Sequence, residues 1–362
     1  MAVRVSVVVP TYKRPELLNR CLQALISQDF DPSAYEVIVV DDAADETTRR
    51  LVEAWSREAV AWAYLPGIEL RQPVSSIHAS VEAAATQVQA QGSWVLLAGL
   101  PRMRYIPTVR RLGPAAARNC GWRAASGEFI AFTDDDCIPA PDWLKVGVRA
   151  LESGAQGASG RVIVPLPPEP TDYERDAAGL SRSVFVTANC FYQRSVLALA
   201  GGFDENFTLP WREDSDLYFR LRRLGCKLIE APGAVVIHPL RPAAWGVSLG
   251  QQRKSMFNAL LYKKHPDLYR RTIQPSPPWH YYTAVAFLGF SLIGSLFHSP
   301  MLALLGFYAW TGLTLGFCAR RMQHTSHGLN HLIEMLVTSA LIPPLSVYWR
   351  LRGAVKFRVF FL

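Results

Sequence analysis

A short apolar run, residues 129–132, leads through one threonine into Asp134, Asp135 and Asp136, and this stretch limits the possible folds more strongly than any other. Apolar runs of this length, bounded by polar residues, are typical of buried β-strands. Open α/β sheets bind ligands beyond the carboxyl ends of their strands, which is where these carboxylates would lie. Three adjacent like charges repel one another unless they are well solvated or share a divalent cation such as Mg²⁺ or Mn²⁺. The alternative to a metal site is therefore a solvated acidic turn.

Two strand–helix units precede the aspartates. A β-branched run over residues 5–9 is stopped by Pro10, and a helical pattern of apolar residues then extends to Leu25. A second strand over residues 35–40 is followed by an acidic turn and another helix. Alternating strands and helices predict right-handed parallel crossovers and an α/β, Rossmann-like sheet. The first strand is not followed by G-x-G-x-x-G, which counts against a dinucleotide oxidoreductase.

With its flanks, the aspartate stretch resembles the metal-binding Asp-x-Asp motif of family 2 glycosyltransferases, which have the GT-A fold. Further motifs match that family in the same order along about the first two thirds of the chain. They are Pro10-Thr11-Tyr12, Asp41-Asp42, Gly113 to Gly121 with Arg118 and Asn119, Gly201-Gly202-Phe203-Asp204-Glu205 and Glu213-Asp214. The resemblance implies a GT-A nucleotide-sugar-binding catalytic domain over residues 1–240. Residues 61–100 depart from the family spacing and are expected to be an insertion.

The resemblance also implies a nucleotide pocket. Tyr12 would stack on or line the base, and Asp42 would accept a hydrogen bond from it. Asp42 could instead cap the following helix, although Asp45 is at least as well placed for that. Arg118 would lie near the diphosphate or the base, and its alternative is a surface arginine on an Ala-rich helix. The nucleotide-sugar-binding residues implied in this way are Pro10, Thr11, Tyr12, Asp42, Arg118, Asp134 and Asp135.

The divalent cation, Mn²⁺ or Mg²⁺, would be held by Asp134 and Asp136. A short strand over residues 234–237 runs into His238. In several GT-A enzymes a histidine at this point ligates the metal or contacts the diphosphate, and neutral imidazole suits manganese. A lone histidine at a strand end is more often structural, so both interpretations of His238 stay open.

A second acidic cluster, Glu213 to Asp216, leads into a predicted helix. Transfer of a sugar to an alcohol needs a base that removes the hydroxyl proton, and backbone N–H groups at a helix N-terminus hold a carboxylate in place. In the family the Asp of the Glu-Asp pair is that base, which implies Asp214 as the base and Glu213 as the residue that orients the acceptor or the base. Asp216 is expected to interact with the helix dipole. The alternative for the whole cluster is an ordinary capped helix.

Charge and cysteine content restrict the partners and the compartment. The chain has 38 Lys and Arg against 30 Asp and Glu, a net charge of +8. Many of the basic residues flank the apolar C-terminal segments, so anionic lipid headgroups explain much of the excess, and no nucleic acid is expected as a partner. The six cysteines include no C-x-x-C pair, which argues against zinc or a disulfide framework and fits a reducing cytoplasm.

The C-terminal part, residues 279–362, has a membrane-like composition. Residues 281–297 and 301–318 are predicted to form a hairpin of two short spans, which returns Arg320 and Arg321 to the cytoplasm. The third segment, residues 329–348, contains Pro343 and Pro344 and is predicted to be broken or re-entrant, since interior proline costs about 3 kcal/mol. Residues 241–278 are expected to form a linker or interfacial helix, and residues 165–182 a mobile flap. A helical bundle of a soluble domain is the alternative.

Together these features predict a multi-pass protein of the cell membrane with a cytoplasmic catalytic domain. It would be an inverting glycosyltransferase that moves a sugar from a nucleotide-diphosphate sugar to a hydroxyl of a lipid or glycan acceptor, in lipid-linked or cell-envelope glycan synthesis. One alternative is a processive polysaccharide synthase, although Gln251-Gln252-Arg253-Lys254 lacks the tryptophan of the usual Gln-x-x-Arg-Trp motif. The other alternative is a non-catalytic scaffold protein that keeps the GT-A fold.

Overall fold

The computed structural model describes residues 2–62 and 100–362. The predicted insertion at residues 61–100 therefore lies almost entirely outside the described residues. The chain divides into two compact units that interleave along the sequence. The first unit contains residues 1–161, 187–202 and 226–236, and the second contains residues 162–186, 203–225 and 237–362.

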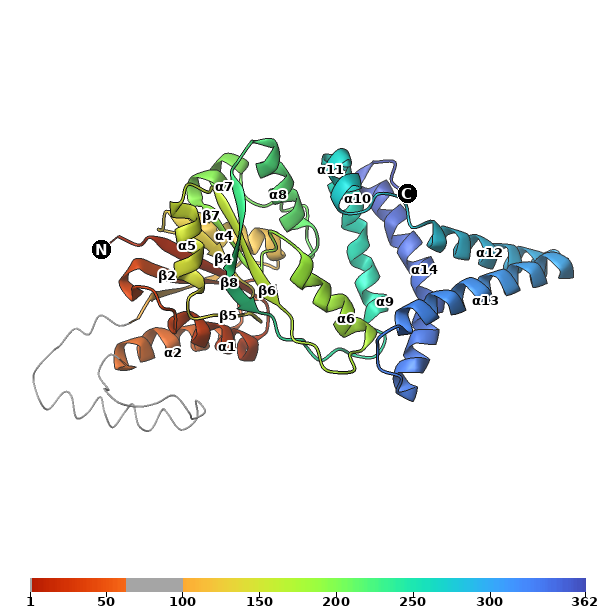
Figure 1. The fold of residues 1–362 in the computed structure, drawn as a ribbon, viewed down its shortest axis with the longest axis horizontal. Helices are drawn as coiled ribbons and strands as arrows, with labels where there is room; N and C mark the ends of the chain where they lie inside the picture. Colours follow the sequence, from red (N-terminus) through yellow and green to blue (C-terminus); the bar gives the residue numbers. More distant parts are fainter. Residues whose placement is uncertain (1, 63–99) are drawn as a thin grey trace, which may run out of the picture. The chain divides into compact units, whose positions relative to one another are not determined.

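The first unit is built on a mixed sheet of eight strands in the order β3-β2-β1-β4-β7-β6-β8-β5 (Figure 1). β1 pairs in parallel with β2 and β4, and β2 pairs in parallel with β3. β7 runs antiparallel to both β4 and β6. The strands are β1 (Val5–Thr11), β2 (Tyr35–Asp41), β3 (Arg102–Pro107), β4 (Phe129–Phe132), β5 (Ile138–Pro139), β6 (Gly157–Ile163), β7 (Cys190–Gln193) and β8 (Leu228–Ile237). Only the last residues of β6 and β8 belong to the second unit.

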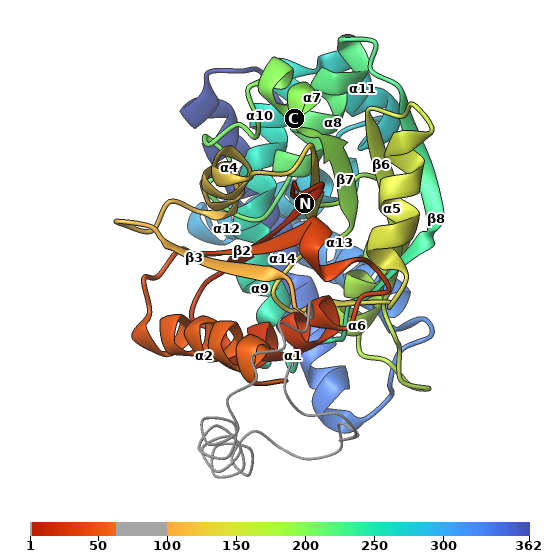
Figure 2. The same ribbon diagram turned by 90° about the vertical axis from the view of Figure 1, so that its left-hand side faces the viewer.

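Helices cover both faces of this sheet. Figure 2 shows α1 and α2 on one side of strands β2 and β3 and α4 on the other. α1 buries Leu18, Cys21, Leu22 and Leu25, which recur at the spacing of one helical face. α4 packs so closely on β1 that a Cβ atom at Gly121 would come within 2.3 Å of the Val8 side chain. The helices of the first unit are α1 (Pro15–Ile26), α2 (Glu46–Trp62), α4 (Pro114–Ala124), α5 (Trp143–Glu152) and α7 (Arg194–Ala200).

The parallel strand–helix units predicted from the sequence are confirmed by β1, α1, β2 and α2. β8 differs from the prediction, because it starts at Leu228 and the expected strand starts at residue 234. The early part of β8 contains Pro232 and Gly233. Both residue types are depleted in strands, so the sequence pattern does not predict a strand before residue 234.

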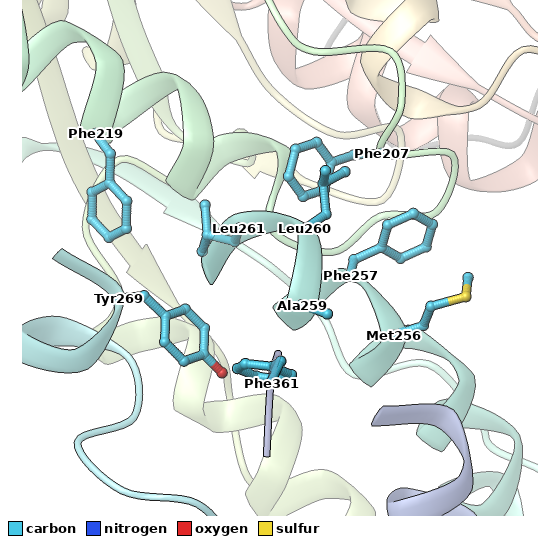
Figure 3. Close-up of a cluster of buried hydrophobic side chains, with 9 residues drawn as sticks. All are labelled: Phe207, Phe219, Met256, Phe257, Ala259, Leu260, Leu261, Tyr269 and Phe361. Atoms are coloured by element: carbon cyan, nitrogen blue, oxygen red, sulfur yellow. The ribbon is translucent and has the colours of Figure 1, made fainter. Parts of the chain in front are cut away.

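The second unit is helical. Its buried hydrophobic cluster joins residues from α8 (Glu213–Arg223) and the segment before it, from α10 (Met256–Lys264), from α11 (Pro266–Thr272) and from the end of the chain. The cluster, drawn in Figure 3, contains Phe207, Phe219, Met256, Phe257, Ala259, Leu260, Leu261, Tyr269 and Phe361. The region expected to be a linker, residues 241–278, forms α9 (Val247–Gln251), η4 (Gln252–Ser255), α10 (Met256–Lys264) and α11 (Pro266–Thr272). The other helices are α6 (Asp172–Ala178), η3 (Gly179–Arg182), α8 (Glu213–Arg223), α12 (Trp279–Leu296), α13 (Pro300–Met322) and α14 (Leu329–Phe357).

Residues 172–182, part of the predicted flap at residues 165–182, form the helical turns α6 and η3. Thr171 and Glu174 make a reciprocal capping box, in which each side chain binds the backbone N–H of the other residue. The carboxylate of Asp172 also accepts a hydrogen bond of 2.7 Å from Arg321 of α13. The segment is therefore anchored at its start.

α12 and α13 form a close antiparallel hairpin, which Figure 1 shows extending away from α14. A Cβ atom at Gly306 would lie 2.4 Å from the backbone nitrogen of Ser291, and one at Gly294 would lie 2.4 Å from that of Ala303. Each helix thus has a glycine where the other backbone approaches, as in the small-residue contacts of membrane helices.

α14 corrects one prediction. The sequence predicts a break at Pro343 and Pro344, but both prolines lie inside one continuous helix of 29 residues. The helix buries a long stripe that runs along its whole length, and this packing offsets the loss of two backbone hydrogen bonds. The buried stripe is His331, Met335, Thr338, Ser339, Ile342, Pro343, Ser346, Val347, Arg350 and Gly353.

Two of the described helices, α13 and α14, are long and apolar enough by length and composition to cross a membrane. α12, which corresponds to the predicted span at residues 281–297, has 18 residues and is not among them. α14 buries polar as well as apolar side chains and exposes several aliphatic ones. Thr338 and Ser339 are fully buried, whereas Ile333 and Leu341 are 47% and 44% exposed.

Candidate active site

The parallel strands of the first unit bring several predicted residues to one edge of the sheet. Thr11, at the end of β1, is in register with Asp41 of β2, which is in register with Pro107 of β3. β4 pairs Phe132 with Val8 and so ends beside β1, and Asp134 follows two residues later. The loops after β1, β2, β3 and β4 therefore start at the same edge, where α/β sheets bind ligands.

The three aspartates after β4 are mostly removed from solvent. Asp135 and Asp136 are only 3% and 6% exposed, which excludes the solvated acidic turn. Asp135 accepts hydrogen bonds from Thr11 Oγ1 at 2.8 Å and from Arg14 Nη1 at 3.3 Å. Asp134 Oδ1 accepts one from Arg118 Nη2 at 2.7 Å. Asp135 is therefore held from β1 and the loop after it, whereas Asp134 is held from α4.

The electrostatics of the cluster fit a divalent cation. Burial and the neighbouring Asp136 carboxylate raise the pKa of Asp135 to about 6, although Arg14 and the Thr11 hydroxyl act in the opposite direction. Like charges close together and out of water are stabilised when a cation lies between them. The donor atoms are hard carboxylate oxygens, which Mg²⁺ and Mn²⁺ prefer. Asp134 and Asp136 are thus suitable ligands by chemical type and burial.

Asp42 anchors a loop. Its carboxylate accepts hydrogen bonds from the backbone nitrogens of Leu112 at 2.7 Å and Gly113 at 2.8 Å, and from Thr108 Oγ1 at 3.1 Å. These contacts fix the segment between β3 and α4. The N-terminal turn of α2 is instead bound by Asp45, whose Oδ2 accepts from the backbone nitrogen of Thr48 at 3.0 Å. Carboxylate oxygens have further lone pairs, so the role of Asp42 at the base stays a prediction.

Tyr12 lies in the loop after β1 and is partly exposed, and Pro10 before it is partly buried. The guanidinium carbon of Arg111 lies 4.4 Å from the centroid of the Tyr12 ring, a cation–π contact. The Tyr12 ring is thus in contact with the guanidinium of Arg111, from the loop before α4. The predicted contact of Tyr12 with a nucleotide base stays a prediction.

Arg118 is 3% exposed. The alternative of a surface arginine is therefore excluded, because α4 points this side chain inward toward Asp134. A buried guanidinium needs a partner, and the Asp134 carboxylate supplies one. The proximity of Arg118 to a diphosphate stays a prediction.

Glu213 and Asp214 open α8 in the second unit. Glu213 is 3% exposed, and Asp214 Oδ1 accepts a hydrogen bond of 2.6 Å from the backbone nitrogen of Ser215. The residue before them, Arg212, has a φ of 75°, a left-handed conformation that is unfavourable for a residue with a side chain. The structure thus holds Asp214 at the start of α8 with a strained residue close by.

Asp216 has a larger role than the predicted interaction with the helix dipole. Its buried carboxylate contacts Arg220 Nε at 2.9 Å, Lys264 Nζ at 2.7 Å and His265 Nε2 at 3.0 Å. Burial alone would raise its pKa, but the hydrogen bond with His265 and the cations Arg220 and Lys264 lower it to about 2. Asp216 therefore connects α8 to the end of α10. The sequence contains no signal for this contact, because His265 lies 49 residues away.

His238 directly follows β8. Its backbone nitrogen donates to the carbonyl oxygen of Ile163 at 2.8 Å, and its side chain is partly buried. His238 belongs to the second unit, whereas Asp134 and Asp136 belong to the first. Its role as a metal ligand stays a prediction.

Three residues near these sites were not identified from the sequence. Arg14 and Arg111 contact Asp135 and Tyr12, and their only sequence signal is that they are basic residues in loops at the ligand edge. Asn189 is fully buried; its Oδ1 accepts from Trp143 Nε1 at 2.8 Å, and its Nδ2 donates to the Ala234 carbonyl at 2.8 Å. A single asparagine has no pattern that would identify it in advance.

Curated relatives include glycosyltransferases. The chain is 27% identical to glycosyltransferase AglE of Haloferax volcanii over 250 residues, which cover 66% of this chain and 67% of AglE. It is 22% identical to validoxylamine A glucosyltransferase of Streptomyces hygroscopicus subsp. limoneus over 311 residues, which cover 73% of this chain and 57% of that protein.

Among solved structures, the chain resembles the mannosyltransferase PcManGT from Pyrobaculum calidifontis in complex with GDP-Man and Mn²⁺. The TM-score is 0.50 at 18% sequence identity, and the alignment covers 99% of this chain and 88% of PcManGT. At this identity the likeness shows the fold alone. The fold is GT-A, as the sequence predicts.

Two family models match the chain. The model of glycosyl transferase family group 2 matches residues 172–351. The model of glycosyl transferase family 2 matches residues 6–95 and 79–187, which together make up half of the chain. Since that model spans the sheet edge with its three aspartates, this protein belongs to glycosyl transferase family 2.

Proposed function

We propose that this family 2 glycosyltransferase is a membrane-attached, inverting enzyme that transfers a sugar from a nucleotide-diphosphate sugar to an acceptor hydroxyl at the cytoplasmic face of the cell membrane. The observation that carries the proposal is the buried carboxylate cluster after β4, with Arg118 paired to Asp134 at 2.7 Å. A buried acidic cluster at the ligand edge of a sheet is suited to a cation and the phosphates that it binds.

In this proposal Asp134 and Asp136 hold Mn²⁺ or Mg²⁺, with His238 as a further ligand. The bound cation offsets the charge that develops on the departing diphosphate. Arg118 orients Asp134, and Thr11 and Arg14 orient Asp135 through the hydrogen bonds given above. PcManGT forms a complex with GDP-Man and Mn²⁺, a nucleotide-diphosphate sugar and a divalent cation, which supports this choice of donor and metal.

Asp214 is the proposed base. The backbone N–H of Ser215 holds one of its oxygens at 2.6 Å, so the other oxygen is available to accept the proton of the acceptor hydroxyl. Attack by that hydroxyl on the anomeric carbon in one displacement inverts the configuration there. Glu213 is the proposed residue that orients the acceptor or the base.

Membrane attachment is supported by the exposed aliphatic side chains of α14. Most of its outward residues are aliphatic, and its inward residues include hydroxyls and a guanidinium, an arrangement that suits a hydrocarbon environment outside. Both ends of α14 contact helices of the second unit: Glu334 accepts from the backbone nitrogen of Gly246 at 2.7 Å, and Gly353 lies against Met256. We therefore propose that α14 lies along the membrane interface. Attachment there favours a lipid or lipid-linked glycan as acceptor.

The test is hydrolysis of a panel of nucleotide sugars by the detergent-solubilised full-length protein with Mn²⁺, comparing wild type with Asp136→Ala and Asp214→Asn. We expect turnover of one donor, which Asp136→Ala abolishes through loss of the metal site and Asp214→Asn through loss of the base. Removal of divalent cations with EDTA should have the effect of Asp136→Ala on the wild-type protein. Turnover that survives Asp136→Ala would contradict the assigned metal ligands.

Two alternatives give other outcomes. A processive polysaccharide synthase would release a long polymer when acceptor is added, whereas the proposed enzyme adds one sugar. A non-catalytic scaffold protein would show neither turnover nor metal-dependent binding of any nucleotide. Binding without turnover would leave the proposal standing and identify the acceptor as the missing reactant.

A further inference from the structure

A cavity of about 700 Å³ lies in the second unit, between the α6–η3 segment and the ends of α12 and α13 where the hairpin begins and returns. Its lining combines basic, acidic and apolar side chains. They include Arg182, His280, Phe317 and Arg320, with the carboxylates of Asp172 and Asp176.

The cavity has an excess of positive charge. Of its four arginines, Arg321 is used by the fold, because it binds the Asp172 carboxylate at 2.7 Å and the hydroxyls of Thr338 and Ser339 at 2.7 and 3.0 Å. Arg175 donates to the carbonyl oxygen of Gln323.

Arg182 and Arg320 differ from these two arginines. Within the described part of the chain they form no ion pair, and both side chains are exposed at the cavity. Two guanidinium groups that line one cavity without carboxylate partners are suited to a phosphate group, which accepts paired hydrogen bonds from arginine.

The position of the cavity along the hairpin indicates where such a phosphate would come from. The start of α12 and the end of α13 lie together at the base of the hairpin in Figure 1. The cavity is at this base, because His280 belongs to the start of α12, and Phe317 and Arg320 belong to the end of α13. The opposite end is apolar and open, with Phe297 74% and Met301 81% exposed. At a rise of about 1.5 Å per residue, the helix from Met301 to Arg320 is about 28 Å long, close to the thickness of a bilayer hydrocarbon core.

An exposed aromatic residue also lies at the base of the α12–α13 hairpin. Trp279 is 54% exposed and starts α12, one residue before the cavity residue His280. Tryptophan and tyrosine are enriched at the level of lipid headgroups, and lipid phosphates lie at that level. With the apolar end of the hairpin in hydrocarbon, the cavity would therefore lie beside the phosphates of the lipids.

We propose that this cavity binds the phosphate group of a membrane lipid, with Arg182 and Arg320 as its ligands and the lipid chain along the α12–α13 hairpin. Phe317 lines the cavity and supplies an apolar surface for the first carbons of that chain. The proposal rests on the membrane attachment in the proposed function and names the chemical class of lipid that the site selects.

The test is flotation of full-length protein with phosphatidylcholine vesicles, with and without phosphatidic acid. The variant is Arg182→Gln/Arg320→Gln. The matched control, which removes the same number of charges, is Arg271→Gln/Arg358→Gln, at two exposed arginines that do not line the cavity. We expect phosphatidic acid to strengthen wild-type binding. We expect the double variant to reduce that gain about 30-fold, since each basic residue near an anionic surface contributes about 1 kcal/mol, which is about fivefold in affinity. The control should keep most of the gain.

Two results would overturn the proposal. Equal losses in the double variant and in the control would indicate general attraction to an anionic surface. Displacement of the protein by inorganic phosphate, at the same phosphate concentration as the lipid, would indicate a site for the free anion.

The two proposals can fail separately. Arg182→Gln/Arg320→Gln should retain donor hydrolysis in detergent, because neither residue is assigned to the donor or to the base. If phosphatidic acid has no effect but Asp136→Ala still abolishes hydrolysis, the cavity proposal fails and the glycosyltransferase proposal stands. If the lipid effect is observed and no donor is hydrolysed or bound in a metal-dependent way, the cavity proposal stands and the glycosyltransferase proposal fails.

Discussion

At the scale of single residues, the candidate site depends on buried charges that have specific partners. Arg118→Met removes the guanidinium that binds Asp134 at 2.7 Å and leaves that carboxylate without its cation. We expect a loss of about 2 kcal/mol of stability, less than for a fully buried pair because the Asp134 side chain is 28% exposed. We also expect the KM for the donor to rise at least about tenfold.

Thermal unfolding and donor kinetics measure these two effects. Arg123→Met is the matched control, because Arg123 is on the same helix and its side chain is exposed. Equal effects of the two substitutions would show that the pairing of Arg118 with Asp134 has no special role.

Asp216 gives a prediction about pH. Its pKa of about 2 in the folded protein is below the value of about 3.9 for an unperturbed aspartate, so its ionised form stabilises the fold. That stabilisation is complete above about pH 5 and is lost as the pH falls from about 5 to about 1, with a total of about 2–3 kcal/mol. Urea unfolding across this range should show the loss in wild type, and Asp216→Asn should remove this part of the pH dependence. Asp267→Asn is the control, since that side chain is 52% exposed, and a similar effect there would contradict the prediction.

At the scale of elements, the α12–α13 hairpin depends on its glycines. Gly306→Leu places a side chain where a Cβ atom would already lie 2.4 Å from the Ser291 backbone, so the helices must separate. We expect a loss of about 2 kcal/mol or more, measured by thermal unfolding in detergent. Gly312→Leu is the control on the same helix, because nothing lies within 4 Å of its Cβ position. Equal melting temperatures for both variants would contradict the close packing.

α14 offers a second test at this scale. Pro344 lies inside the helix and provides no backbone N–H, so Pro344→Ala should restore one helical hydrogen bond. We expect a gain of about 2 kcal/mol, after allowance for the greater freedom of the unfolded chain. Pro300→Ala is the control, since Pro300 is the first residue of α13, where that donor is not needed. A loss of stability in Pro344→Ala would indicate that α14 needs the proline for its shape.

At the scale of the whole molecule, the proposed membrane attachment would depend on the outward side chains of α14. The triple variant Ile333→Ser/Val337→Ser/Leu341→Ser removes three aliphatic groups that are 38–47% exposed. At about 1 kcal/mol for each partly exposed aliphatic side chain, affinity for phosphatidylcholine vesicles should fall about 100-fold. The melting temperature in detergent should change little, since these side chains are not part of the core.

The control removes exposed apolar side chains elsewhere, with Val109→Ser, Leu199→Ser and Leu224→Ser. It should bind vesicles like wild type. If the α14 variant floats with vesicles as well as this control does, the outer face of α14 is not a membrane surface.

The sequence alone determined the features that depend on neighbouring residues. The alternation of β1, α1, β2 and α2 follows from hydrophobic periodicity, which is a local property. The position of the aspartates at the end of β4 follows from the same pattern. Family motifs then identified the fold and the class of enzyme, because the residues of each motif are adjacent in the chain.

The tertiary structure decided what depends on residues far apart in the chain. Asp42 binds the backbone of Leu112 and Gly113 about seventy residues away, and Asp216 pairs with His265 across 49 residues. No periodic pattern in the sequence indicates either contact, so neither could be predicted. The continuity of α14 also depends on distant residues. The loss of helix stability at its two prolines is a local property, but the burial of its inner stripe requires packing against other segments. Local propensity is fixed by adjacent residues, but the packing that offsets it exists only after distant segments have come together.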